Sequence, residues 1–184
     1  MRPLLLSLAI ACTGGPSVTP PTPDAPEPAA PADQDAFGSY TLRFPDPGTQ
    51  YLEVELVLPK PPADLKLRMA SWTPGSYKIR DYARHLEGLS VNTGDGTPLA
   101  VEKISKDTWS VSGAEGSPSV VVRYSLYAAV MAVQSNWVEP DFAMLNGAPT
   151  FLLPVGHEAA TYDVRISAPD AWPHISTALP PHPK

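Results

Sequence analysis

From Phe37 onward, hydrophobic and polar residues alternate with a period of two, the pattern of a strand with one buried face. The clearest case is YLEVELVL at residues 51–58, where Glu53 and Glu55 separate the apolar positions. The same alternation recurs in four other segments. The positions predicted to face inward are Tyr40, Leu42 and Phe44; Leu52, Val54, Leu56 and Leu58; Leu65, Leu67 and Met69; Val120, Val122, Tyr124 and Leu126; and Tyr162, Val164 and Ile166.

Turn-forming segments such as PDPG, NTGDG and AEGSP separate these strands. No segment shows the 3.6-residue periodicity of a long amphipathic helix. The hydrophobic content of 43% is sufficient for a core. We therefore predict an all-β domain, a β-sandwich or saddle-like β domain, over residues 37–184.

Residues 13–36 have a different composition. Between Pro16 and Pro31, seven of sixteen residues are Pro and none is aromatic. Such a segment cannot bury enough apolar surface to offset the entropy of ordering it. The sequence predicts a disordered, Pro-rich linker at residues 13–36.

The leader MRPLLLSLAIAC has Arg2 followed by a short apolar run, which is too short to span a bilayer but typical of a signal peptide. Cys12, the only cysteine, directly follows LAIA. This pattern resembles a bacterial lipoprotein signal over residues 1–12, with Cys12 as the lipidated residue, although Ala9 stands where Leu is more usual. An ordinary secretory signal is the alternative. We expect an exported protein, either a lipoprotein on the periplasmic side of a membrane or a secreted one.

The formal net charge is −6 and the isoelectric point is about 5.1. No basic stripe exists that could replace the counterions of a nucleic acid, so we expect no nucleic-acid partner.

The sequence matches no known catalytic motif well. His157 and Glu158 are adjacent, but the fourth residue after His157 is Thr161, whereas a zinc hydrolase needs a second His there on a helix. Cys12 belongs to the leader, and TPGSY lacks the strand–Ser–helix elbow of a hydrolase. We expect no catalytic and no metal-binding residues in this chain.

The segment SWTPGSYKIRDYARH, residues 71–85, brings together aromatic, charged and turn-forming residues more densely than the rest of the chain. Pro74-Gly75 predicts a tight turn. Two interpretations remain: a packed strand-to-strand connection, or an interaction surface. We expect Trp72 and Tyr82 to be buried and Arg80 to pair with Asp81 or Glu87. Tyr77 and Lys78 should be exposed.

This segment, with GLSV, PLAVEKISKDTWSV, VRYSLYA, MLNGAPTFLLPVG and SAPDAWPHISTAL, resembles the N-terminal domain of the glycyl aminopeptidase family, the PDZ-containing zinc metallopeptidases of metallopeptidase family 61. The resemblance implies a thermolysin-like catalytic domain with a His-Glu-x-x-His helix, and a PDZ domain, both beyond Lys184. Zinc is therefore expected in that catalytic domain and not in this chain, which should be inactive alone. Members commonly carry Arg near Gln134, so no anion-binding role is transferred to that position.

The resemblance also implies that this domain walls one side of the substrate cleft. The residues it suggests for the cleft or domain interface are Trp72, Tyr77, Lys78, Arg80, Arg84 and Asn146. The expected partners are a peptidase catalytic domain, in cis or in trans, a peptide substrate, and a membrane through the lipid anchor. Alternatives are a stand-alone lipoprotein module that binds peptides or proteins, and a small independent enzyme.

Overall fold

The structure, a computed structural model, describes residues 36–76 and 78–181. The predicted leader with Cys12, the linker up to residue 35, and Tyr77 lie outside the described residues.

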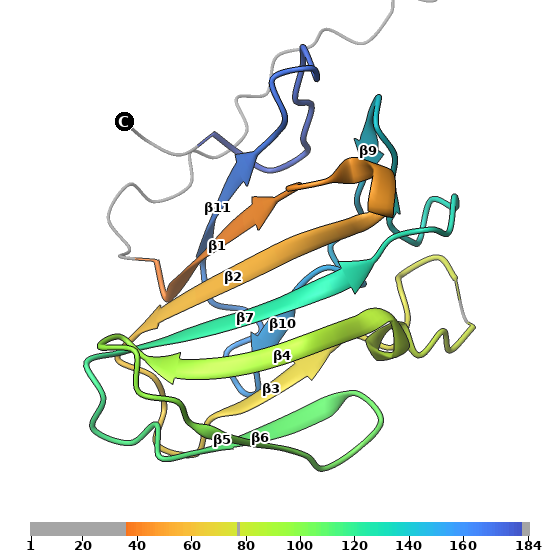
Figure 1. Cartoon of the computed structure of the whole chain (residues 1–184). Coiled ribbons are helices and arrows are strands. Elements are labelled where there is room, and N and C mark those ends of the chain that lie inside the picture. Colours follow the sequence, from red (N-terminus) through yellow and green to blue (C-terminus); the bar gives the residue numbers. More distant parts are fainter. Residues whose placement is uncertain (1–35, 77, 182–184) are drawn as a thin grey trace, which may run out of the picture. The chain divides into compact units, whose positions relative to one another are not determined.

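The larger sheet has five strands in the order β11-β1-β2-β7-β4 (Figure 1). All neighbours are antiparallel except β1 and β11, which pair in parallel. The strands are β1 (Gly38–Arg43), β2 (Tyr51–Pro59), β4 (Leu86–Thr93), β7 (Ser119–Tyr127) and β11 (Tyr162–Ser167).

A four-stranded antiparallel sheet has the order β10-β3-β6-β5, and β8 pairs with β9 as a separate ribbon. The strands are β3 (Lys66–Met69), β5 (Ala100–Lys103), β6 (Thr108–Ser112), β8 (Trp137–Val138), β9 (Ala143–Met144) and β10 (Leu152–Pro154). Two short 3-10 helices complete the described elements, η1 (Pro47–Thr49) and η2 (Tyr82–His85). Within the described residues, no helix is long and apolar enough to cross a membrane.

One hydrophobic core joins the two larger sheets, because inward residues of β1, β2 and β7 pack with those of β3, β6 and β10. The predicted all-β sandwich is confirmed. Every residue predicted to face inward on β1, β2, β3 and β7 is buried. On β11, Tyr162, Val164 and Ile166 are only partly buried, since β11 is an edge strand of the larger sheet.

Two buried tyrosines connect the sheets through hydroxyl groups. The Tyr40 hydroxyl donates to the carbonyl oxygen of Leu152 at 2.6 Å. The Tyr124 hydroxyl donates to the carbonyl oxygen of Thr150 at 2.8 Å and accepts from the Leu152 N–H at 3.1 Å. Burial raises the pKa of both phenols well above the ordinary value, so both stay protonated donors.

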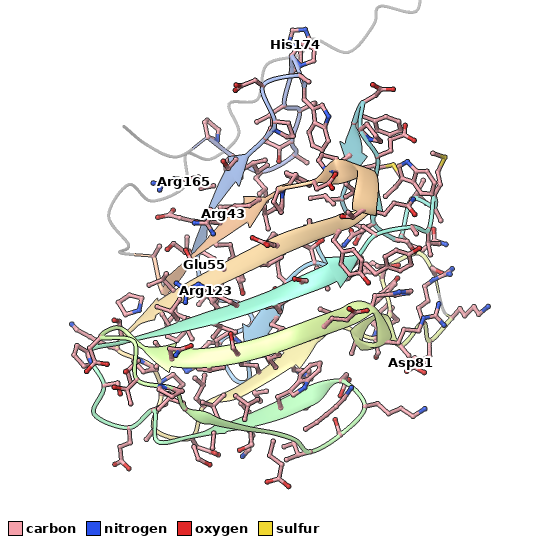
Figure 2. The ribbon with its side chains drawn as sticks, viewed as in Figure 1. Arg43, Glu55, Asp81, Arg123, Arg165 and His174 are labelled. Atoms are coloured by element: carbon pink, nitrogen blue, oxygen red, sulfur yellow. The ribbon has the colours of Figure 1, made fainter. Side chains whose placement is uncertain are left out.

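The outer face of the larger sheet carries a charged cluster (Figure 2). Glu55 accepts from Arg43 at 3.2 Å and from Arg123 at 2.8 Å. Partial burial acts to raise the pKa of Glu55, but the hydrogen bonds and positive charges of the two guanidinium groups outweigh it and lower the pKa. Because both arginines are largely exposed, this cluster is a solvated cross-strand ion pair network.

Candidate functional site

Three connections meet at one end of the sandwich, at the right of Figure 1. The first connection, residues 71–76 and 78–81, follows β3; the second, residues 129–136, follows β7; and the third, residues 139–148, surrounds β9. Together they are called here the three-loop surface. Hydrogen bonds join them: with its amide oxygen turned toward the guanidinium group, Gln134 accepts from Arg80, and the Asn136 side-chain oxygen accepts from the Asn146 N–H. Segments far apart in the sequence therefore form one surface.

The first loop is shaped by the predicted turn at Pro74-Gly75. Gly75 has a φ of 80°, which an L side chain rarely adopts, and the Ser76 N–H donates to the Thr73 carbonyl at 3.1 Å. The Arg80 N–H closes the loop on the Ser71 carbonyl at 2.8 Å. The loop thus has defined geometry on both sides of Tyr77.

The third loop is fixed by Asn146, which is partly buried. Its N–H donates to the Asn136 side-chain oxygen at 2.9 Å, and its side-chain amide donates to the Val133 carbonyl at 3.1 Å. The Thr150 hydroxyl donates to the Asn146 carbonyl at 2.7 Å. Asn146 therefore holds the third loop against the second.

Of the expectations for residues 71–85, two are confirmed and two are wrong. Tyr82 is 3% exposed and Lys78 is exposed, as predicted. Trp72, predicted to be buried, is 48% exposed. The alternation of β3 ends at Met69, so the pleat no longer directs Trp72 toward the core, and Tyr82 on η2 enters the core instead.

The predicted ion pair of Arg80 is also wrong. Asp81 has a left-handed backbone, with φ of 47°, and lies 3.7 Å from the Lys106 ammonium group. Glu87 accepts from the Tyr51 hydroxyl at 3.1 Å. Both carboxylates thus have other neighbours, and Arg80 donates to Ser76 at 3.1 Å.

Arg84 lies outside this loop, on η2, and is exposed. Its Nε donates to His85 Nε2 at 3.0 Å. Burial, and then the positive charge of Arg84, lower the pKa of His85. Beside it, an open hollow of about 500 Å³ is lined by three cations, one carboxylate and two neutral residues: Arg84, Lys103, Lys106, Asp81, Ile104 and Ser105.

The three-loop surface is rich in uncovered apolar side chains. It holds six of the eleven large hydrophobic residues that are exposed among those described: Trp72, Ile79, Val130, Met131, Val133 and Phe142. Val133 is 83% exposed. Sequence reasoning missed Val130, Met131 and Val133, although the apolar run AAVMAV between two strands was the available signal. Clustered exposed apolar residues are typical of a surface that another molecule covers.

Buried polar atoms without a partner gather here too. Among the described residues, four side-chain atoms are buried with no hydrogen-bond partner: Thr73 Oγ1, Arg80 Nε, Tyr82 OH and Trp137 Nε1. All four belong to the first loop, to η2 directly after it, or to β8 directly after the second loop. Native proteins leave few such atoms, so each is a place where an ordered water or a group of another molecule would supply the missing partner.

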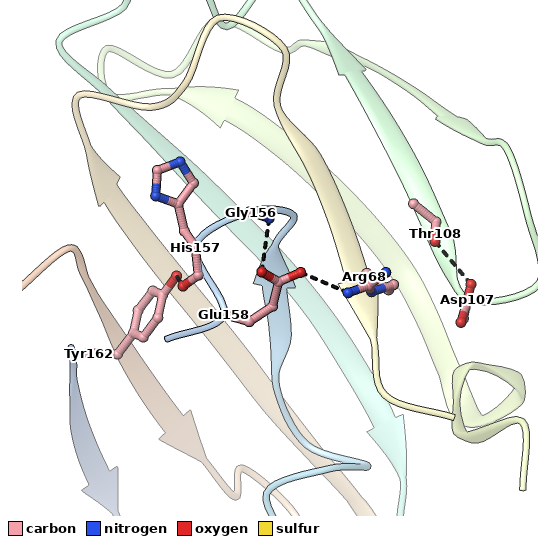
Figure 3. A network of polar contacts seen from close by, with 7 residues as sticks. All are labelled: Arg68, Asp107, Thr108, Gly156, His157, Glu158 and Tyr162. Carbon is pink, nitrogen blue, oxygen red and sulfur yellow. Dashed lines mark hydrogen bonds and ion pairs between the residues drawn. The ribbon is translucent and has the colours of Figure 1, made fainter. Parts of the chain in front are cut away.

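His157 and Glu158 lie away from this surface and have structural partners (Figure 3). The His157 ring stacks on Phe37 with ring centroids 4.3 Å apart. Glu158 pairs with Arg68 at 2.7 Å and accepts from the Gly156 N–H at 2.9 Å. Hydrogen bonds from backbone N–H groups, with Arg68, lower the pKa of Glu158. Among the described residues, no three His, Cys, Asp or Glu side chains are grouped so as to hold a metal ion.

The fold is that of an all-β domain, and the three-loop surface gathers exposed apolar side chains at one end of it. The Peptidase M61 N-terminal domain family matches residues 39–184, and the chain belongs to this family. The resemblance to the N-terminal domain of family 61 metallopeptidases is thereby confirmed.

The domain is also similar to a solved structure, an aminopeptidase N family protein from Idiomarina loihiensis. The TM-score is 0.68 and the sequence identity 26%, over 73% of this chain and 22% of that one. The chain thus corresponds to about a fifth of the length of that aminopeptidase. No curated protein matches the chain.

Proposed function

We propose that this chain is the non-catalytic N-terminal β domain of an exported, glycyl-aminopeptidase-like metallopeptidase, and that its three-loop surface walls one side of the substrate cleft of a catalytic domain. The observation that carries this proposal is the uncovered apolar surface in a member of the Peptidase M61 N-terminal domain family. An interface of this kind excludes water from a cleft and fixes the position of a bound peptide.

The contribution of this domain is binding and positioning. Its described residues offer no group of three metal ligands, so they do not fit the zinc ion that the family implies. In this proposal the catalytic domain supplies the zinc ligands and the general base, in cis or in trans. Trp72, Ile79 and Val133 supply apolar contact area, while Asn136 and Asn146 keep the second and third loops in place.

Export and lipidation belong to the same proposal. The leader and Cys12 would attach the chain to a membrane, and the Pro-rich segment at residues 13–36 would hold the β domain at a distance from it.

The proposal is tested by titrating the full chain with a separately produced family 61 catalytic domain encoded in the same genome. Val133→Asp, at the most exposed residue of the apolar cluster, should weaken association by at least about tenfold, since it places a charge in the interface. Val155→Asp is the matched control: Val155 is also exposed, but it lies at the other end of β3, where its N–H bonds to Lys66.

The control should bind within about twofold of the unmodified chain. Equal binding by the chain and by both variants would place the interface elsewhere. Tight binding of unrelated proteins or peptides, without the catalytic domain, would favour the alternative of a stand-alone binding module.

A further inference from the structure

Arg80 is held in place by groups from two loops. Its N–H donates to the Ser71 carbonyl at 2.8 Å, and its Nη2 donates to the Ser76 hydroxyl at 3.1 Å. With its amide oxygen turned toward the guanidinium group, the orientation that satisfies both side chains, Gln134 accepts from Nη2 at 2.7 Å and from Nη1 at 3.3 Å. The guanidinium group is thus pre-positioned on the three-loop surface.

The positive charge of Arg80 has no counter-charge in the described part of the chain. All its acceptors are neutral, and no described carboxylate lies within the 4.0 Å that defines an ion pair. Its Nε is buried without an acceptor. A partly buried cation is costly unless it is paired, so a carboxylate from another molecule would stabilise it.

The surroundings of Arg80 favour a protein surface over a small solute as the source of the missing charge. Trp72 and Ile79 in the same loop, and Val133 beside Gln134, are all exposed. A small carboxylate would leave these side chains in water, where an ion pair contributes little. A folded partner would cover them, remove water from the guanidinium group and strengthen the pair.

We propose that Arg80 binds a carboxylate of the protein that covers the three-loop surface. This inference rests on the proposed function, under which the carboxylate is an Asp or Glu side chain of the catalytic domain. After the contacts with Ser76 and Gln134, Nη1 keeps one N–H for such a carboxylate, at a position that the planar guanidinium group fixes and a lysine ammonium group cannot reproduce.

The test is the same titration of the full chain with the catalytic domain, using Arg80→Gln and Arg80→Lys. Arg80→Gln should weaken association by roughly 30-fold, the size typical of an interface hot spot. Arg80→Lys should restore only part of the lost affinity. Arg43→Gln is the control, because it removes the same charge from the outer face of the larger sheet, where Arg43 pairs with Glu55. It should bind within about twofold of the unmodified chain.

The melting temperature of each variant, measured alone, checks that it is folded. Binding by Arg80→Gln equal to that of the unmodified chain would overturn the inference and leave the proposed function standing. Failure of the unmodified chain to bind would overturn both. If Arg80→Gln leaves association unchanged but raises KM only for acidic peptides, the carboxylate belongs to the substrate, and the protein source proposed here is wrong.

Discussion

His85 lies at a position where protonation is unfavourable. Its Nε2 accepts from Arg84 Nε at 3.0 Å, and burial followed by the charge of Arg84 lowers its pKa. Because the folded chain binds this proton less readily than the unfolded chain, His85 contributes stability that is present above about pH 6.5 and is lost as the pH falls through the lowered pKa.

The melting temperature should therefore fall between about pH 7.5 and pH 5.5. The fall in melting temperature should be smaller in His85→Gln. His174→Gln is the control, because His174 is exposed in the C-terminal segment, and it should show the same fall as the unmodified chain. An unchanged fall in His85→Gln would show that other groups cause it. Glu55 does not interfere, since the stability from its lowered pKa is lost only below about pH 4.5, the ordinary glutamate range.

Trp72 should matter little for the stability of the isolated chain, because it is 48% exposed. Trp72→Ala should lower the free energy of unfolding by less than about 1 kcal/mol. Leu67→Ala, at a fully buried position of β3, should cost roughly 2–5 kcal/mol. Urea unfolding of both variants checks this, and a loss for Trp72→Ala as large as that for Leu67→Ala would contradict it.

Burial of individual residues was predictable wherever a strand imposes its period. Leu52, Leu67 and Val122 are buried as expected, because alternate side chains of a strand point to opposite faces. Trp72 and Arg80 were misplaced because an irregular loop has no period. The Arg80 contact with Gln134 depends on how two distant segments meet, which neither local pattern contains.

At the scale of elements, Tyr124 ties β7 to the connection before β10 and to β10 itself. Tyr124→Phe would leave the Leu152 N–H and the Thr150 carbonyl without this partner, so it should cost about 1–3 kcal/mol. Tyr127→Phe is the matched control on the same strand, because Tyr127 is exposed and its hydroxyl makes only a 3.5 Å contact with Gln50. Chemical denaturation should show almost no change for the control. Equal losses in both variants would argue against this tie between the sheets.

The sequence predicted five strands with strict alternation, and several of those it did not predict have identifiable irregularities. An exception is β6, which alternates regularly, with Trp109 and Val111 buried, and was not predicted. In β4, Gly88 has a φ of 62° and the pairing with β7 shifts register between Glu87 and Ser90, which interrupts the alternation. β5 is an edge strand with no fully buried residue. β8 and β9 have two residues each, too few to show any period. The three-loop surface was predictable only in part, through its first loop and Asn146.

At the scale of the whole molecule, the leader predicts that the protein is attached to a membrane, and this prediction can be tested. If Cys12 is lipidated, the mature protein should partition with membranes and carry acyl mass in a mass spectrum. More than one acyl chain is expected, since a single chain anchors only weakly. Cys12→Ser should release the protein into the soluble fraction. Soluble material that retains Met1 at its N-terminus would contradict lipidation.

The parallel pairing of β1 and β11 has a mechanical consequence. Gly38 pairs with Tyr162 and Arg43 with Ser167, so the chain enters β1 at one end of this pair and leaves β11 at the other. Tension between an attachment ahead of Gly38 and a domain after Ser167 would pull the two strands lengthwise in opposite directions. Their hydrogen bonds would then resist shear together instead of opening one after another. We expect this strand pair to act as the clamp that bears the load, which leaves the three-loop surface undistorted when the molecule is stretched.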